Sequence, residues 1–123
     1  MIKRIHSTLL LCKDINQTTR FYKQLGFSTT ASDDSVRILF GDYRLTFIDE
    51  VSSKLKDDIN MKKGVGMFIF FEVENVDSFY QTLKQNSIPT LSEPEGRAGE
   101  KRRFTVQDPD GYKLVFYTET KDL

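Results

Sequence analysis

The sequence predicts an α+β fold in which one unit occurs twice, each copy running strand, helix, hairpin and one further strand, roughly βαβββ. Two observations lead to this prediction: a capped amphipathic helix recurs at a fixed spacing, and a β-rich hairpin follows each copy. The length of 123 residues, 38% of them hydrophobic, fits one domain with a sizeable core. We therefore expect a single domain over residues 1–123, with modules at about 1–50 and 66–119 and a connector at about 51–65.

The first module opens with a short strand and a helix. The apolar run Leu9–Cys12 is typical of a strand, and Asp14 is suited to cap the N-terminus of the helix that follows. Gly26 is expected to end this helix, because the left-handed backbone just past a helix end costs least for glycine. The apolar side of the helix is formed by Phe21, Tyr22 and Leu25.

The second module repeats this order. Asn75 follows the strand-like run Phe68–Phe71 as Asp14 follows the first strand, an offset of 61 residues. The dipeptide Lys-Gln recurs at the same offset, at 23–24 and 84–85. The apolar side of the second helix is formed by Val76, Phe79, Tyr80 and Leu83.

A hairpin is predicted after each helix. Gly41-Asp42 joins strand-like residues 35–40 to 43–48, and Asp-Pro-Asp-Gly joins 103–107 to 112–117. The second strands, Tyr-Arg-Leu-Thr-Phe and Tyr-Lys-Leu-Val-Phe, match at an offset of 69. We assign the eight additional residues to the charged segment Glu93–Arg102, which is expected to form a mobile lid, a dimer arm or a solvated loop.

Strand alternation sorts the side chains onto two faces. The face toward the helices is predicted to hold Leu10, Cys12, Ile38, Phe40, Leu45, Phe47, Ile69, Phe71, Val73, Phe104, Val106, Leu114 and Phe116. The opposite face is predicted to hold Leu9, Leu11, Arg37, Leu39, Arg44, Thr46, Ile48, Phe68, Phe70, Glu72, Arg103, Thr105, Lys113, Val115 and Tyr117. This second set mixes aromatic and aliphatic residues with a few polar ones, as ligand-binding pockets do.

Composition excludes several kinds of partner and site. Eighteen basic residues balance eighteen acidic ones, which gives no electrostatic reason to expect nucleic acid or a membrane surface. Cys12 is the only cysteine and His6 the only histidine, so an internal disulfide and any multi-cysteine or two-histidine metal motif are ruled out. With only a short apolar run near the N-terminus, we expect a cytoplasmic protein.

Two motifs carry a family resemblance. Asp-Pro-Asp-Gly-Tyr at 108–112, after Arg-Phe-Thr-Val-Gln, and Phe-Tyr-x-x-Leu-Gly-Phe at 21–27 resemble the vicinal oxygen chelate superfamily, which includes glyoxalase I, extradiol dioxygenases, and fosfomycin- and bleomycin-resistance proteins. The resemblance covers nearly the whole chain. It implies two βαβββ modules forming a curved mixed sheet around a cavity, often in a homodimer, with four metal ligands in the metal-dependent enzymes.

The metal-ligand positions implied by this resemblance carry other residue types. They correspond here to Ser7, Thr46, Phe68 and Val115. None supplies the imidazole or carboxylate that such a site needs. Strand alternation places His6 on the opposite side, and the replacement candidates Glu72 and Glu119 are scattered, so we expect no metal and no cofactor.

The favoured interpretation is a metal-free protein that binds or sequesters a small organic molecule. Arg37, Arg44, Arg103 and Lys113 outnumber the one carboxylate, Glu72, so the ligand is expected to have an anionic or electron-rich part. A cationic drug such as bleomycin would instead call for an acidic pocket. The alternatives are a lyase, dioxygenase or transferase with atypical ligands or no metal, in which Glu72 is the one candidate base, and a subunit whose cavity has collapsed.

Overall fold

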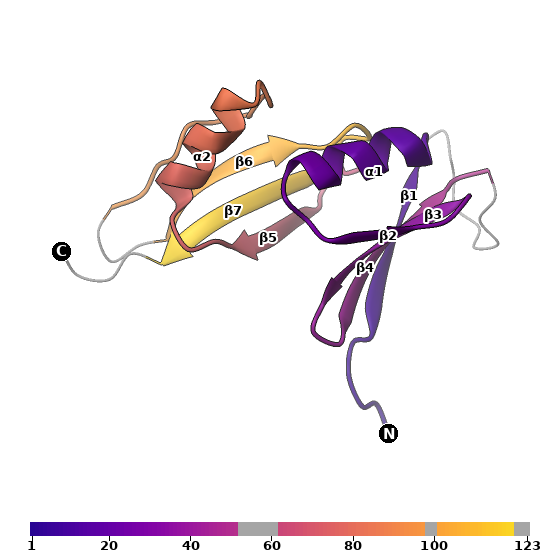
Figure 1. The fold of residues 1–123 in the computed structure, drawn as a ribbon. Helices are drawn as coiled ribbons and strands as arrows, with labels where there is room; N and C mark the ends of the chain where they lie inside the picture. The colour runs from indigo at the N-terminus through magenta and orange to yellow at the C-terminus, as the bar shows by residue number, and fades with distance from the viewer. Residues whose placement is uncertain (52–61, 98–100, 120–123) are drawn as a thin grey trace. The chain divides into compact units, whose positions relative to one another are not determined.

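The computed structural model describes residues 1–51, 62–97 and 101–119, and it divides the chain into two compact units, residues 1–63 and 64–123. Unit 1 contains β1 (Ser7–Cys12), α1 (Ile15–Gln24), β2 (Thr29–Ala31), β3 (Ser35–Phe40) and β4 (Tyr43–Asp49). Unit 2 contains β5 (Phe68–Glu72), α2 (Val76–Gln85), β6 (Lys101–Gln107) and β7 (Lys113–Glu119). The predicted α+β class, with strand, helix and hairpin in each unit, is confirmed (Figure 1).

Unit 1 is a four-stranded mixed sheet with a helix on one face. The strand order is β1-β4-β3-β2; β1 runs parallel to β4, and the other neighbours are antiparallel. The Asp14 carboxylate caps α1 by accepting hydrogen bonds from the backbone N–H groups of Asn16 and Gln17 at 3.0 and 3.2 Å. The helix packs on β2, β3 and β4. The core beneath it is formed by Leu10, Cys12, Ile15, Tyr22, Leu25, Val36, Ile38, Leu45 and Phe47.

Unit 2 repeats this design with three strands, in the order β5-β7-β6. The Asn75 side chain caps α2 by accepting a hydrogen bond from the Ser78 backbone N–H at 3.0 Å, and α2 packs on β6 and β7. Phe79, Phe104 and Phe116 pack against one another in this core with tilted rings whose centres are 4.8–6.0 Å apart. Its other buried residues are Val76, Tyr80, Leu83, Ile88, Val106, Tyr112 and Leu114.

The duplication is present in the strand register. Ser7 pairs with Arg44 in unit 1, and Phe68 pairs with Lys113 in unit 2, so the offsets are 61 for the first strand and 69 for the last. In the hairpins, the pair Ser35 and Ile48 corresponds to Arg103 and Tyr117, offsets of 68 and 69. Seven of the eight additional residues therefore lie between α2 and β6, and one lies in the hairpin turn, which corrects the assignment of all eight to residues 93–102.

Among the described residues, the additional strand of each module is present only in unit 1. There it is β2, whereas in unit 2 it is reduced to an isolated bridge between Glu95 and Arg103. Phe40 was predicted to lie in the core between sheet and helix. It is 43% exposed at the end of β3, although its ring contacts Phe27. Tyr112 precedes β7 rather than opening it. The other predicted strands begin and end within one or two residues of the observed limits. For example, β1 starts at Ser7, whereas the strand was predicted to start at Leu9.

The Asp-Pro-Asp-Gly turn is held by its first residue. Asp108 is buried, and its carboxylate accepts hydrogen bonds from the backbone N–H groups of Asp110, Gly111 and Tyr112 at 2.9–3.0 Å. The motif therefore stabilises a tight hairpin at β7, and its aspartates serve the fold.

The connector is anchored on the unit 1 side. Glu50 and Lys63 form an ion pair of 2.5 Å between largely buried side chains, on either side of the intervening segment. Most of the predicted connector, residues 52–61, lies outside the residues that the structure describes.

Candidate functional site

The predicted site residues lie on the helix-free faces of the two sheets. On β4, Leu45 and Phe47 are buried toward α1, which places Arg44 and Thr46 on the other face. On β7, Leu114 and Phe116 are buried toward α2, which places Lys113 and Tyr117 opposite. Neighbouring strands extend each face in register, so unit 1 contributes Leu9, Leu11, Arg37, Leu39 and Ile48, and unit 2 contributes Phe68, Phe70, Glu72, Arg103, Thr105 and Val115.

The unit 1 face combines aliphatic and cationic side chains. Leu9 is 40% exposed and Leu39 is 50% exposed. Arg37 pairs across the strands with Thr46, and Arg44 pairs with Leu39 on one side and with Ser7 on the other. This face therefore has two guanidinium groups with hydroxyl groups beside them.

The unit 2 face is aromatic. Phe68 and Phe70 are 57% and 55% exposed, and the Phe70 ring meets the Tyr117 ring edge to face at 6.1 Å. The Lys113 ammonium lies 5.9 Å from the centre of the Phe68 ring, and the Lys101 ammonium lies 4.8 Å from that of Tyr117. Lys101 was missed in the sequence because β6 was expected to start at Arg103; the alternation of a longer strand would have revealed it.

Polar and buried positions complete the unit 2 face. Glu72 and Arg103 are exposed and stand on either side of Tyr117 in the strand register. Val115 lies between Phe70 and Thr105 and is only 3% exposed. A general base at Glu72 would have to work from an exposed position.

The four positions that the resemblance assigns to metal ligands do not fit a metal ion. Ser7 and Thr46 offer neutral hydroxyls, Phe68 an exposed ring, and Val115 a buried aliphatic group. Within the described part of the chain, no group of three or more His, Cys, Asp or Glu residues is placed to hold a metal. The donor set lacks the imidazole and carboxylate groups that zinc, iron or manganese require.

His6 lies outside the sheet, which corrects the expectation that it faces the helix-covered side. It precedes β1 and is exposed, with its Nδ1 atom 3.2 Å from the Ser7 hydroxyl. Its backbone carbonyl accepts a hydrogen bond from the Arg44 N–H at 3.2 Å. The side chain is therefore at the end of the unit 1 face.

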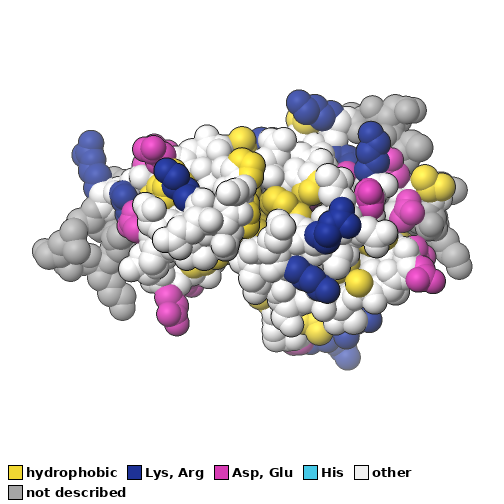
Figure 2. Space-filling model, turned by 45° about the horizontal axis from the view of Figure 1, so that its top comes forward, with side chains coloured by type: hydrophobic (Ala, Val, Ile, Leu, Met, Phe, Trp, Pro, Cys, Tyr) yellow, Lys and Arg dark blue, Asp and Glu magenta, His cyan; other side chains and the backbone are white. Residues whose placement is uncertain are grey.

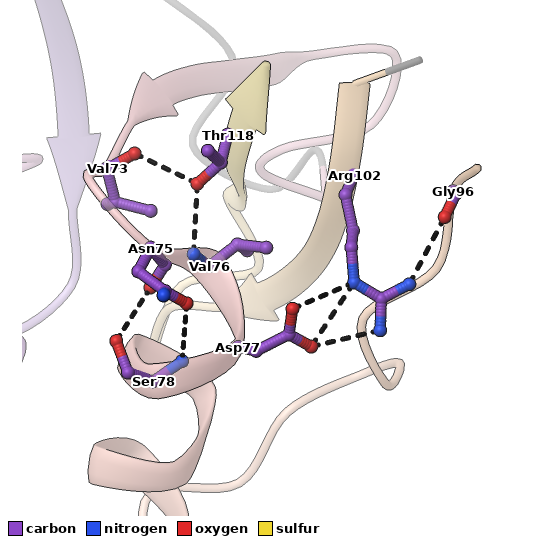
Figure 3. Close-up of polar contacts among 8 residues, drawn as sticks. All are labelled: Val73, Asn75, Val76, Asp77, Ser78, Gly96, Arg102 and Thr118. Atoms are coloured by element: carbon purple, nitrogen blue, oxygen red, sulfur yellow. Dashed lines mark hydrogen bonds and ion pairs between the residues drawn. The ribbon is translucent and has the colours of Figure 1, made fainter. Parts of the chain in front are cut away.

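Arg102, at the end of the 93–102 segment, binds the start of α2. Its guanidinium donates to both carboxylate oxygens of Asp77 at 2.9–3.2 Å and to the Gly96 carbonyl at 3.2 Å (Figure 3). The hydrogen bonds from Arg102 lower the pKa of Asp77 below its ordinary value of 3.8, and charge attraction assists. The same pairing raises the pKa of Arg102. Arg102 therefore lies on the helix side of β6, away from the candidate face.

A shallow hollow of about 310 Å³ lies at the C-terminal end of α2, away from the predicted site. Its walls are formed by Tyr80, Lys84, Ser87, Ile88, Pro89 and Thr90. The Lys84 ammonium lies 5.5 Å from the centre of the Tyr80 ring, so the cation is already engaged by the protein.

Positive and negative side chains of the described residues are mixed on the face drawn in Figure 2. Electrostatic recognition would therefore depend on small groups of residues. Neither described helix is long and apolar enough to cross a membrane.

The sequence matches one protein-family model over most of its length. Residues 4–116 match the family model described as Glyoxalase/Bleomycin resistance protein/Dioxygenase superfamily. Among curated proteins, none matches the sequence.

Solved structures with the same fold cover almost the entire chain. A virulence protein from Salmonella typhimurium is 22% identical with a TM-score of 0.77, covering 98% of this chain and 99% of its own. A glyoxalase/bleomycin resistance protein/dioxygenase from Nocardioides is 16% identical with a TM-score of 0.78, covering 98% and 85%. Lactoylglutathione lyase from Agrobacterium tumefaciens is 19% identical with a TM-score of 0.72, covering 95% and 94%. At these identities the likeness shows a shared fold.

Proposed function

The chain belongs to the Glyoxalase/Bleomycin resistance protein/Dioxygenase superfamily, and on that premise we propose that it binds a small organic molecule without a metal ion. The proposed ligand carries an aromatic or otherwise planar group. The exposed rings of Phe68 and Phe70 on the helix-free face of unit 2 carry this proposal.

Two exposed aromatic rings on one strand face are costly to leave in water. Burying apolar surface is favourable by about 25 cal/mol per Å², and an aromatic ligand would add edge-to-face or offset-stacked contacts. Phe70 already meets Tyr117 in this way, so a planar ligand would extend an existing aromatic group. Phe68 also occupies a position that the family's metal enzymes give to a ligand, where a ring offers stacking instead of coordination.

The cations beside these rings favour an electron-rich or anionic ligand. Lys113 and Lys101 lie over the rings of Phe68 and Tyr117, where each keeps donors free for a ligand group. We therefore expect naphthalenesulfonate, an aromatic anion, to bind more tightly than a naphthyl trimethylammonium ion of similar size.

Binding of naphthalenesulfonate, measured by isothermal titration calorimetry, tests the proposal. Phe68→Ala and Phe70→Ala should each raise its Kd by about five- to tenfold, from the loss of one stacking contact. Phe40→Ala is the matched control, since it removes a ring of comparable exposure from the helix side of the unit 1 sheet. An unchanged Kd in both face variants, or an equal loss in the control, would refute the aromatic site.

The homodimer expected from the resemblance remains a prediction. Light scattering coupled to size-exclusion chromatography tests it, with a mass near twice the monomer's 14.3 kDa as the expected result.

A further inference from the structure

We propose that the helix-free face of unit 1 contains an oxyanion-binding site formed by Arg37 and Arg44. The ligand group would be a carboxylate, phosphate or phosphonate. This goes beyond the proposed function, because it assigns a second site, on unit 1 alone, to residues separate from the aromatic surface of unit 2.

The strand register brings the two arginines together. Arg37 stands opposite Thr46, and Arg44 stands opposite Leu39, so the two arginines are diagonal neighbours on adjacent antiparallel strands. Such diagonal neighbours are about 7–8 Å apart, within reach of long side chains. Both guanidinium groups can therefore approach one oxyanion from the same face.

No protein group in the described part of the chain neutralises this pair. Arg37 is exposed, Arg44 is half-buried, and neither forms an ion pair or side-chain hydrogen bond with a described residue. Asp42, the carboxylate in the hairpin turn two residues before Arg44, pairs with Arg4. Two uncompensated like charges at this spacing repel each other, and a bound anion would relieve that repulsion.

Neutral donors surround the arginine pair. Ser7 is the register partner of Arg44 on β1, and Thr46 is the register partner of Arg37, so both hydroxyls lie on the same face. Guanidinium groups bind carboxylates and phosphates through paired N–H donors, and hydroxyl groups can satisfy the remaining oxygens. The arrangement thus offers several donors and no competing carboxylate at its centre.

The second unit serves as an internal comparison. The residues equivalent to Arg37 and Arg44 are Thr105 and Lys113, at offsets of 68 and 69. A diagonal guanidinium pair therefore exists in unit 1 alone, although the two equivalent strands of unit 2 pair in the same register. The equivalent residues also supply fold-compatible substitutions, Arg37→Thr and Arg44→Lys.

Phosphate, methylphosphonate and acetate, each titrated against sodium chloride at matched ionic strength, test the site. The readout is the set of arginine side-chain Nε–H signals in nitrogen-15 NMR spectra at mildly acidic pH. We expect saturable shifts of the Arg37 and Arg44 signals with at least one oxyanion. The anion that saturates at the lowest concentration identifies the ligand group.

The variants define what supports and what overturns the inference. Arg37→Thr should weaken oxyanion binding about tenfold, the equivalent of one charge-assisted hydrogen bond. Arg44→Lys should weaken it less, because a lysine keeps the charge and loses the paired donors. Arg20→Gln, which removes an exposed charge from α1, should leave it unchanged. Shifts no larger than those with chloride, or an equal loss in Arg20→Gln, would overturn the site.

This outcome is separable from that of the aromatic proposal. Inorganic phosphate has no ring, so its binding does not require Phe68 or Phe70. Loss of naphthalenesulfonate binding with intact phosphate binding would refute the aromatic surface and leave the arginine site standing.

Discussion

Thr118 connects the last strand of unit 2 to the start of its helix through two hydrogen bonds. Its hydroxyl accepts from the Val76 backbone N–H at 2.9 Å and donates to the Val73 carbonyl at 2.9 Å (Figure 3). Val76 is the first residue of α2, whose N–H has no partner inside the helix. One side chain thus satisfies two backbone groups that the helix and the sheet leave open.

Replacing Thr118 by Val should lower the free energy of unfolding by about 1–3 kcal/mol, because two partly buried backbone groups lose their partner. Urea unfolding followed by circular dichroism measures the change. Thr118→Ser keeps the hydroxyl and should recover most of the stability. A larger loss in Thr118→Ser than in Thr118→Val would show that the methyl group, rather than the hydroxyl, is responsible.

The ion pair of Asp77 and Arg102 predicts a specific pH dependence. Because folding lowers the pKa of Asp77, the pair's stabilisation is fully present above the ordinary value of 3.8. It is lost as the pH falls below 3.8 through the lowered folded pKa. Arg102, whose pKa is raised, stays charged throughout this range. The stability difference between the wild type and Arg102→Ala should therefore shrink on acidification.

Arg102→Ala should also return the pKa of Asp77 toward 3.8, which an NMR titration of the side-chain carboxyl carbon reports. Arg103→Ala is the matched control, since Arg103 is the next residue and faces the opposite side of β6. If Asp77 titrated identically in wild type and Arg102→Ala, the hydrogen bonds of Figure 3 would not control its pKa.

At the scale of elements, both helices end in the same motif with different residues. After α1, Gly26 has a φ of 99° and the Phe27 N–H bonds the Tyr22 carbonyl. After α2, the equivalent position 61 residues later is Ser87, with a φ of 58°, and the Ile88 N–H bonds the Leu83 carbonyl. The second helix end therefore places a side chain where the backbone favours glycine.

Ser87→Gly should raise the free energy of unfolding by about 0.5–1 kcal/mol, because it removes the left-handed strain of a residue with a Cβ. Gly26→Ser should lower it by a similar amount in the equivalent place. Chemical denaturation of both variants measures the pair of changes. A loss of stability in Ser87→Gly would mean that its side chain contributes more than the strain costs.

Local signals were enough to predict most elements. The caps Asp14 and Asn75 and the helix end at Gly26 are properties of short segments, and the structure confirms them. The absence of a β2 equivalent from the described residues of unit 2 was not predictable, because a three-residue strand such as β2 depends on its neighbour β3 more than on its own sequence. Only the observed strand register shows that seven of the eight additional residues lie between α2 and β6 and that one lies in the hairpin turn.

At the scale of the whole molecule, the candidate site was predicted as one face lining a cavity, and the structure places its residues on the helix-free face of each unit's sheet. Alternation is a local rule, so it assigned Arg44 and Phe68 to the correct face of each strand. Exposure at each position depends on packing across strands, and the sequence could not predict that Val115 is buried beside exposed Phe70. The duplication then shows that equivalent positions have diverged: Arg37 and Arg44 correspond to Thr105 and Lys113, and Phe68 and Phe70 correspond to Ser7 and Leu9.

This divergence leads to a prediction about metal removal that involves both units. The four positions that hold ligands in the family's metal enzymes are hydroxyl, aromatic or aliphatic here, so no tightly bound metal ion should contribute to stability. A metal present at a hundred times its Kd would stabilise the fold by about 2.7 kcal/mol, which corresponds to several degrees in Tm.

Extensive dialysis against a chelator should therefore leave the Tm unchanged, together with the Kd for naphthalenesulfonate. Added zinc, manganese, nickel or iron should not raise the Tm. Elemental analysis of the untreated protein provides the control, since it shows whether there was any metal to remove. A stoichiometric metal that survives dialysis against buffer, and whose chelation lowers the Tm, would show that other residues coordinate it and would redirect the function toward metal-dependent catalysis.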